Sequence, residues 1–205
     1  MNHKLQSTLS AIVLAALVLT LAVTPTQAAS APTQLDRPQQ LSFEKFVSAV
    51  ANGQAGVVRG VYVADVLALR VDQQPANRPD YVNATNGRAT QFQTAAYFDV
   101  IGLLAHNYRS GALFFKLQPG HEVKIVYGDR TIETYLVSAI YQYQALQPND
   151  TRGDLVDLTT GQQVSVIEAF NQVYTGDKHV TFQTCIRRAG NAAWGRYFVV
   201  ATPIP

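Results

Sequence analysis

The sequence predicts a mostly β fold that forms a closed or nearly closed barrel with two short helices. Apolar and polar residues alternate along six to eight short strands, glycine- or proline-containing turns separate them, and only two segments have helical periodicity. Of the 205 residues, 47% are hydrophobic and 15% are charged, which is enough apolar material for a core and too little charge for a disordered chain. The length favours one domain.

The first residues have the layout of an export segment. Lys4 precedes an apolar run from Leu9 to Val23, and small residues follow it. A cleaved signal peptide fits this pattern, and an uncleaved N-terminal membrane anchor is the alternative. We expect residues 1–29 to be that signal peptide or anchor, 30–40 a polar linker, and 41–205 the folded domain. The domain is then extracytoplasmic, either secreted or anchored to the outer face of the cytoplasmic membrane.

The folded part begins with a short amphipathic helix over 42–53. Apolar residues recur there at helical spacing, Ser42 can cap the start, and Gly53 can end the helix. The apolar period then changes to two, which predicts strands. These runs are 57–71, 95–106, 121–128 and 131–146. The pair Gly128-Asp129 lies between the last two runs and predicts a hairpin turn.

A second helix is expected over 165–177. Ser165 and Glu168 form a capping-box pattern, an apolar face follows, and Gly176 ends the segment. Two more strands, 179–186 and 196–202, close the chain.

Charge and composition exclude several classes of partner. The formal charge is +2 with no lysine-rich block, which argues against binding nucleic acid through its phosphates. One cysteine and scattered histidines do not form a zinc-ligand set. The carboxylates of Asp150, Asp154, Asp157 and Glu168 are candidates for calcium, but such loop acids are usually solvated. We therefore expect no cofactor.

Cys185 is the only cysteine, so an exported chain has no internal partner with which it can form a disulfide. It ends a predicted strand and precedes the polar stretch 187–193, a position where side chains are presented to substrate. A buried and inert thiol is the alternative interpretation.

A cysteine nucleophile needs a nearby base. His3 belongs to the export segment, and His121 is expected to be a surface turn residue. His179 is on the same strand as Cys185, and six residues of extended chain span about 20 Å, so the two cannot meet. His106 remains, at the end of an apolar strand. A structural histidine with satisfied hydrogen bonds is the alternative.

Arg196 opens the last predicted strand. If the last two strands lie side by side, Arg196 is brought back toward Cys185. Its guanidinium could then donate to a developing oxyanion. An ordinary arginine at a strand edge is the alternative.

These residues resemble a known family. The sequence 181-TFQTC-185 resembles the Thr-Leu-x-Thr-Cys signature of the sortases, which are cell-surface cysteine transpeptidases. His106 precedes 113-LFFKLQPG-120, which resembles the family's Phe-x-x-Leu-x-x-Leu-x-x-Gly segment, and Arg196 opens the terminal strand as in that family. The resemblance covers roughly 57–202. Phe182 replaces the signature leucine, and His121 stands where the family often has aspartate.

The resemblance implies a closed eight-stranded β-barrel with a few short helices. It also implies that Cys185 is the nucleophile, His106 the general acid and base, and Arg196 the stabiliser of the tetrahedral intermediate, while Thr184 helps to form the substrate-binding site. Partners would be surface proteins with a C-terminal sorting signal similar to Leu-Pro-x-Thr-Gly. The acceptor would be an amine of a cell-wall precursor or a pilin lysine, and an uncleaved N-terminus would also bind the membrane.

Two other functions remain open. Cys185-Ile186-Arg187 matches the end of the L,D-transpeptidase signature Ser-His-Gly-Cys-Ile-Arg, but Gln183 and Thr184 stand where that motif needs His and Gly. A non-catalytic exported β-barrel for binding is the other, and it predicts a buried Cys185. For an enzyme, we expect the loops 72–94, 146–164 and 187–195 to border the substrate groove.

Overall fold

The computed structural model describes residues 37–204, with side chains described from residue 42. The export segment expected at 1–29 therefore lies outside the described residues. None of the helices in the described part is both long and apolar enough to cross a membrane.

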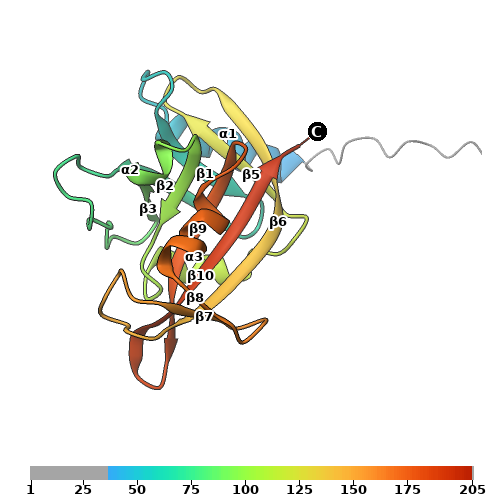
Figure 1. Cartoon of the computed structure of the whole chain (residues 1–205). Helices are drawn as coiled ribbons and strands as arrows, with labels where there is room; N and C mark the ends of the chain where they lie inside the picture. The colour runs from blue at the N-terminus through green and yellow to red at the C-terminus, as the bar shows by residue number, and fades with distance from the viewer. Residues whose placement is uncertain (1–36, 205) are drawn as a thin grey trace, which may run out of the picture. The chain divides into compact units, whose positions relative to one another are not determined.

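Ten strands form one sheet that closes on itself (Figure 1). They are β1 (Val58–Val63), β2 (Leu67–Gln73), β3 (Arg88–Phe92), β4 (Val100–Leu104), β5 (Glu122–Tyr127), β6 (Ile132–Ala145), β7 (Leu155–Asp157), β8 (Gln163–Val164), β9 (His179–Arg188) and β10 (Asn191–Pro203). Eight of them follow the order β10-β9-β4-β3-β2-β1-β5-β6, and pairing of β10 with β6 closes the barrel. The strands β7 and β8 extend the sheet beyond β6. The predicted mostly β fold with a closed eight-stranded barrel is confirmed.

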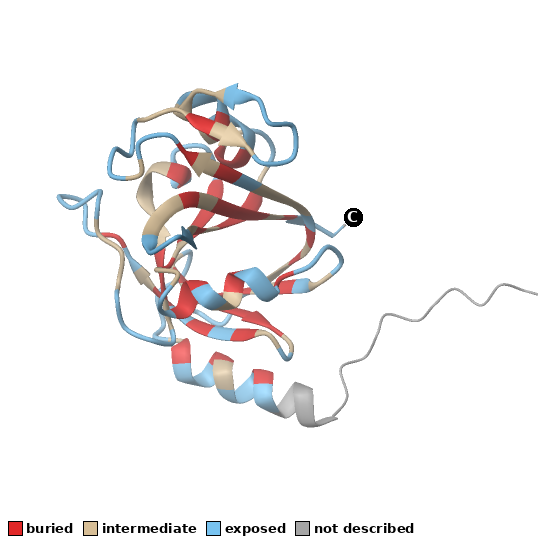
Figure 2. Cartoon of the chain, turned by 90° about the horizontal axis from the view of Figure 1, so that it is seen from below, coloured by how far each residue is buried: buried red, intermediate tan, exposed pale blue. Residues whose placement is uncertain are grey.

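The barrel is mixed, because β2 pairs with β3 and β4 with β9 in parallel while the other pairs are antiparallel. Side chains alternate between its two faces. On β9, Val180 and Phe182 belong to the interior core, as do Tyr197 and Val199 on β10. Figure 2 shows buried residues along the strands of the barrel. Odd-numbered residues of β9 and even-numbered residues of β10 therefore face outward.

The first helix, α1 (Arg37–Val50), begins before the predicted start at Ser42, and residues 37–40, expected in the linker, belong to it. Pro38 is compatible with this start because the first helical turn has no intrahelical partner for its N–H groups. The helix packs its apolar face on Tyr62 of β1, with the rings of Phe43 and Tyr62 5.0 Å apart. The chain then turns at Gly53, where φ is +84°.

The helix α3 (Val166–Tyr174) confirms the predicted capping box. The Glu168 backbone N–H donates to the Ser165 hydroxyl at 3.2 Å, and the Glu168 carboxylate accepts from the Ser165 N–H at 2.7 Å. Donation to the Glu168 carboxylate from the backbone N–H and the hydroxyl of Ser165 holds the pKa of Glu168 below its ordinary value. Val173 and Tyr174 pack against Phe198 of β10, so α3 covers the outer face of the barrel.

Several elements differ from the predictions. The run 57–71 is two strands, because Asp65 adopts a left-handed conformation (φ +59°) and turns the chain. The start of the predicted strand 95–106 is instead a short helix, α2 (Gln93–Ala96). β3, β7 and β8 lie inside predicted loops, since each is too short to show an alternating pattern.

The segment after β4 contains a 3-10 helix, η1 (Ser110–Lys116). Its Phe114 is fully buried and meets the ring of Phe182 edge-on at 5.1 Å. This contact anchors η1 to the barrel core, close to the ends of β4 and β9.

Candidate active site

Cys185 lies on the outward-facing side of β9 and is half-buried, with a free thiol. It is paired directly with Arg196 of β10 in the antiparallel ladder. Residues directly opposite each other in such a ladder have side chains on the same face, with Cβ atoms about 4.5–5.5 Å apart. The predicted adjacency of the last two strands is thus confirmed, and it brings Arg196 beside Cys185.

His106 follows β4, which lies on the other side of β9 from β10. β4 runs parallel to β9 with Leu104 opposite Gln183, and the Ala105 N–H continues this ladder by donating to the Gln183 carbonyl at 3.2 Å. His106 lies two residues past that pair and just beyond the end of β4, and the same register, if continued, would put it level with Cys185. The pairing of β9 with β10 thus puts Arg196 opposite Cys185, and the chain that leaves β4 beside β9 carries His106.

The imidazole of His106 is half-buried and held from two sides. Its Nε2 lies 3.3 Å from the Val82 carbonyl, and its ring stacks on Tyr108 with centroids 5.1 Å apart. Next to it, Asn107 Nδ2 donates to the Ala192 carbonyl at 2.8 Å, which ties this loop to the β9–β10 hairpin. With the proton on Nε2, the ring donates to Val82 and leaves Nδ1 to accept a proton.

The guanidinium of Arg196 is fixed by backbone carbonyls. Its Nη1 donates to Ala193 at 2.9 Å and Gly195 at 3.1 Å, and its Nη2 donates to Pro148 at 3.3 Å. A guanidinium has five N–H donors, so these three bonds leave two for a ligand. Arg196 is therefore an oriented cation with spare donors, at the position of β10 that pairs with Cys185.

Thr184 is 2% exposed, and its hydroxyl donates to the Ala105 carbonyl at 2.8 Å. This contact joins the residue before Cys185 to the residue before His106. Gly111 packs against the same bond, because a Cβ there would clash with Thr184 Oγ1 and lie 2.7 Å from the His106 carbonyl oxygen. Thr184 thus contacts the strand that leads to His106 and does not line the adjacent cavity.

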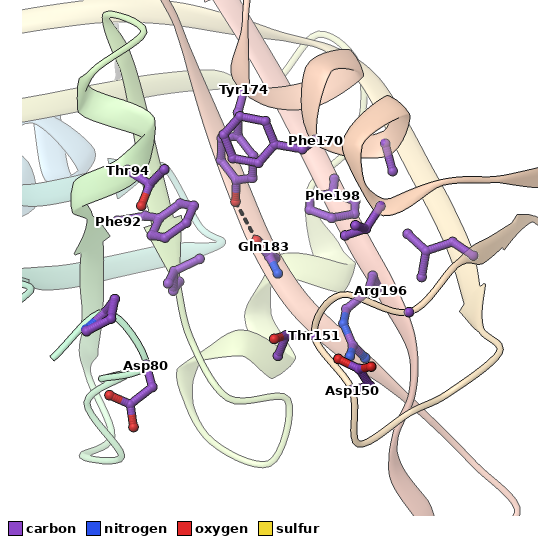
Figure 3. Close-up of a pocket in the computed structure, with 16 residues that line it drawn as sticks. Asp80, Phe92, Thr94, Asp150, Thr151, Phe170, Tyr174, Gln183, Arg196 and Phe198 are labelled. Atoms are coloured by element: carbon purple, nitrogen blue, oxygen red, sulfur yellow. Dashed lines mark hydrogen bonds between the residues drawn. The ribbon is translucent and has the colours of Figure 1, made fainter.

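A cavity of about 530 Å³ adjoins this level of the barrel (Figure 3). Three neighbouring outward-facing residues form a row in its floor: Leu104, Gln183 and Phe198. They lie two residues from His106, Cys185 and Arg196, respectively. The other lining residues are Pro79, Asp80, Phe92, Thr94, Asp150, Thr151, Gly153, Leu155, Val166, Ala169, Phe170, Tyr174 and Arg196. Most of the cavity lining is apolar, and Arg196 is one of its charged residues.

The borders of this cavity match two of the three expected loops. Residues within 72–94 and 146–164 line it, and none within 187–195 does. Sequence reasoning did not identify Gln183, Tyr174 or Phe198 as lining residues. The period-two alternation through Gln183 and Cys185 was the signal that could have placed Gln183 on the same face as the thiol.

The remaining described histidines have structural contacts. The ring nitrogens of His179 lie 2.7 Å from the Asp177 carbonyl and 2.9 Å from the Val173 carbonyl, at the opposite end of β9 from Cys185. His121 Nδ1 accepts from the Gln118 N–H at 3.3 Å. Over residues 42–204, no group of three or more His, Cys, Asp or Glu side chains is arranged to hold a metal ion.

Comparison with known proteins gives a structural similarity only. The chain matches no protein-family model and no curated protein. It is similar to the solved structure of Listeria monocytogenes sortase A, with 14% identity, a TM-score of 0.44, and coverage of 73% of this chain and 88% of that one. It is also similar to a Clostridium perfringens sortase D5 transpeptidase, with 18% identity, a TM-score of 0.44, and coverage of 81% of this chain and 89% of that one. A third similar structure is Streptomyces coelicolor sortase E1, with 15% identity, a TM-score of 0.44, and coverage of 76% of this chain and 91% of that one. These similarities extend over most of the chain at low sequence identity.

Proposed function

We propose that this chain is a sortase-type cysteine transpeptidase. One observation supports the proposal: Cys185 pairs with Arg196 on β10, and the register of β4 with β9, continued past Leu104, would put His106 level with Cys185, beside a mostly apolar cavity. A nucleophile, a base and an oriented oxyanion donor are the groups that acyl transfer needs. The match of 181-TFQTC-185 to the sortase signature supports the same chemistry.

In the first half-reaction, the Cys185 thiolate attacks a backbone carbonyl carbon of the peptide. A bond forms between Sγ and that carbon, and the carbonyl π electrons move onto oxygen, where the free N–H donors of Arg196 stabilise the charge. When the tetrahedral intermediate collapses, the C–N bond breaks, and protonated His106 gives its proton to the leaving amine. The product is a thioester between Cys185 and the acyl part of the substrate.

In the second half-reaction, an amine attacks the thioester carbonyl. Neutral His106 takes a proton from that amine, a new C–N bond forms, and the C–S bond breaks to regenerate the Cys185 thiolate. The overall reaction exchanges one amide for another and needs neither an oxidant nor a metal. Water in place of the amine would give simple hydrolysis.

We propose surface proteins carrying a C-terminal sorting signal as substrates and an amine of a cell-wall precursor or a pilin lysine as acceptor. This assignment follows from the signature match and from the export segment expected at 1–29, and it requires an extracytoplasmic location. The half-buried, outward-facing thiol favours catalysis over a non-catalytic binding barrel, for which a buried and inert Cys185 was expected.

The test is a library of internally quenched sorting peptides incubated with the full-length protein, with and without an amine acceptor. We expect cleavage of a subset of peptides, formation of a ligated product when the amine is present, and no turnover by Cys185→Ala. A peptidoglycan stem peptide in a parallel reaction tests the L,D-transpeptidase alternative.

Thiol labelling of the folded protein separates catalysis from binding. We expect Cys185 to react with iodoacetamide in the native state and to react more slowly in His106→Ala. A native thiol that resists labelling, or cleavage that survives Cys185→Ala, would remove the chemical basis of the proposal.

A further inference from the structure

Gln183 lies on β9 two residues before the proposed nucleophile, Cys185. It faces outward like Cys185, lies between Leu104 on β4 and Phe198 on β10, and lines the cavity. Residues two apart on a strand are separated by about 7 Å. Its side chain is therefore within one peptide-repeat distance of the thiol, on the cavity floor.

The orientation of the Gln183 amide is set by Tyr174 of α3. The Tyr174 hydroxyl donates to Gln183 Oε1 at 2.5 Å, and this tyrosine is only 2% exposed. Burial raises the pKa of Tyr174, so the hydroxyl keeps its proton and remains a donor. A phenol proton directed at the amide requires its oxygen on that side and its nitrogen on the other.

Aromatic neighbours hold Tyr174 in this place. Its ring contacts Phe92 at 5.4 Å, Phe170 at 5.2 Å and Phe198 at 6.1 Å between centroids. These three rings come from β3, α3 and β10, so the hydroxyl that orients Gln183 cannot move without repacking the hydrophobic cluster between α3 and the outer face of the barrel.

The Gln183 amide nitrogen is left with two N–H donors and, within the described part of the chain, no protein partner. Figure 3 shows this nitrogen directed away from Tyr174, toward the side of the cavity where Thr151 and Arg196 lie. The floor on either side of it is apolar. An oriented pair of donors in an apolar cavity favours a ligand group that only accepts hydrogen bonds, such as an amide carbonyl.

An extended peptide presents carbonyl groups at about 3.3 Å per residue, so carbonyls two residues apart are separated by about 7 Å. This repeat equals the distance along β9 from Gln183 to Cys185. If a peptide lies along β9 with its scissile carbonyl at Cys185 and its acyl part in the cavity, a second carbonyl of the acyl part falls at the level of Gln183.

We propose that Gln183, oriented by Tyr174, donates a hydrogen bond to a backbone carbonyl of the acyl part of the peptide, about two residues before the scissile bond. It thereby sets the register of the peptide relative to the thiol and selects for a main chain that is extended at this point. Gln183 is then a substrate-binding residue, and Tyr174 is a positioning residue that acts through it. The inference rests on the proposed transpeptidase function and deepens it.

The experiment uses the full-length protein and the best-cleaved peptide from the library described above. Gln183→Leu removes both donors, and we expect KM to rise about threefold to tenfold with a smaller change in kcat, the range for one neutral hydrogen bond. Gln183→Glu keeps the acceptor for Tyr174 but presents a carboxylate to the carbonyl, so KM should rise further. Melting temperature and Cys185 labelling rate establish that each variant is folded with an intact site.

A set of esters of the same peptide, with one backbone amide replaced at a time, identifies the carbonyl that accepts the bond. An ester carbonyl is a weaker acceptor than an amide carbonyl. At one position before the scissile bond, the ester should raise KM in the wild type and have a clearly smaller effect in Gln183→Leu. This non-additivity is the signature of a direct contact.

Tyr174→Phe tests the orienting role, and Tyr141→Phe is its matched control. The Tyr141 hydroxyl accepts from Gln172 Nε2 of α3 at 2.9 Å, which is also a Tyr–Gln bond between α3 and the barrel but does not line the cavity. We expect Tyr174→Phe to raise KM in the wild type and to have no further effect in Gln183→Leu. Tyr141→Phe should leave KM unchanged in both.

Two outcomes overturn the inference and leave the proposed function standing: every ester has the same effect in the wild type and in Gln183→Leu, or Tyr174→Phe lowers the melting temperature with KM unchanged. The bond is then only a link between α3 and β9. A wild-type protein that cleaves no peptide of the library overturns the proposed function, and the inference with it.

Discussion

The Thr184 hydroxyl donates a 2.8 Å hydrogen bond to the carbonyl of Ala105, and these two residues immediately precede Cys185 and His106. The bond is buried and crosses between two strands that are parallel neighbours in the barrel but far apart in the sequence. It therefore connects the candidate nucleophile with the candidate base through the backbone. The spacing of the two groups depends on a contact that neither of them makes.

Thr184→Val should show whether this hydrogen bond affects catalysis as well as stability. It leaves the buried Ala105 carbonyl unpaired, which costs about 1–3 kcal/mol of unfolding free energy, and it frees the segment that carries His106, so kcat falls. Thr181→Val is the matched control, because the fully buried Thr181 hydroxyl donates to the Val173 carbonyl at the other end of β9. Urea unfolding should show similar losses for both, and peptide cleavage a loss only for Thr184→Val. Equal kcat values in the two variants would contradict the role of Thr184.

Gly111→Ala should disturb the same place by crowding. The new Cβ would lie within 2.7 Å of Thr184 Oγ1 and of the Ala105 and His106 carbonyl oxygens, so the backbone carrying His106 must shift. Misplacement of a catalytic group by about 1 Å costs about 10²-fold in rate, and we expect kcat to fall by that order. Gly60→Ala is also crowded, against Phe46 and Val50 of α1, and should reduce stability with little effect on kcat. A wild-type kcat in Gly111→Ala would show that this packing is not needed.

Arg196→Lys keeps the positive charge but loses the planar set of donors and its bonds to the Ala193, Gly195 and Pro148 carbonyls. Removing one oxyanion donor typically costs about 10²–10³-fold in kcat, and we expect a fall in this range with little change in KM. Arg188→Lys on the same hairpin, where the guanidinium stacks on Trp194, should leave kcat unchanged. Steady-state kinetics with one peptide checks both, and a similar loss in the two variants would indicate a general effect of the hairpin.

Glu133 predicts a dependence of stability on pH. Burial tends to raise the pKa of Glu133, but hydrogen bonds from Lys178, Tyr127 and Tyr135 outweigh it and lower that pKa below the ordinary value of 4.5. A carboxylate with a lowered folded-state pKa contributes stability above about pH 4.5, and that stability is lost as the pH falls through the folded-state pKa. Glu133→Gln should therefore lower the melting temperature at pH 7 and make a smaller difference in more acidic buffer. A difference that stays constant from pH 7 to acid would contradict the charge-based explanation.

Much of the fold follows from local patterns. The capping box at Ser165 and Glu168 and the hairpin at Gly128-Asp129 depend on contacts a few residues apart, and both form as predicted. β3 was missed because its sequence, RATQF, has neither strong alternation nor enough length, and only its neighbours β2 and β4 keep it in the sheet. Tertiary pairing decides such a segment where propensity does not.

By itself, the sequence determined which residues have suitable chemistry: a lone thiol and an arginine on the last two predicted strands, and one histidine after an apolar strand. Both strands are longer than predicted, since β9 runs to Arg188 and β10 begins at Asn191, so Cys185 does not end its strand and Arg196 does not open the other. Only the tertiary structure decided that Arg196 lies opposite Cys185 and that the strand leading to His106 runs beside β9, because these relationships depend on the register of β9 with β10 and on the parallel pairing of β4 with β9. It also placed Tyr174 against Gln183 across α3 and β9. Contacts between distant segments arise from closure of the barrel around its core, which no local pattern encodes.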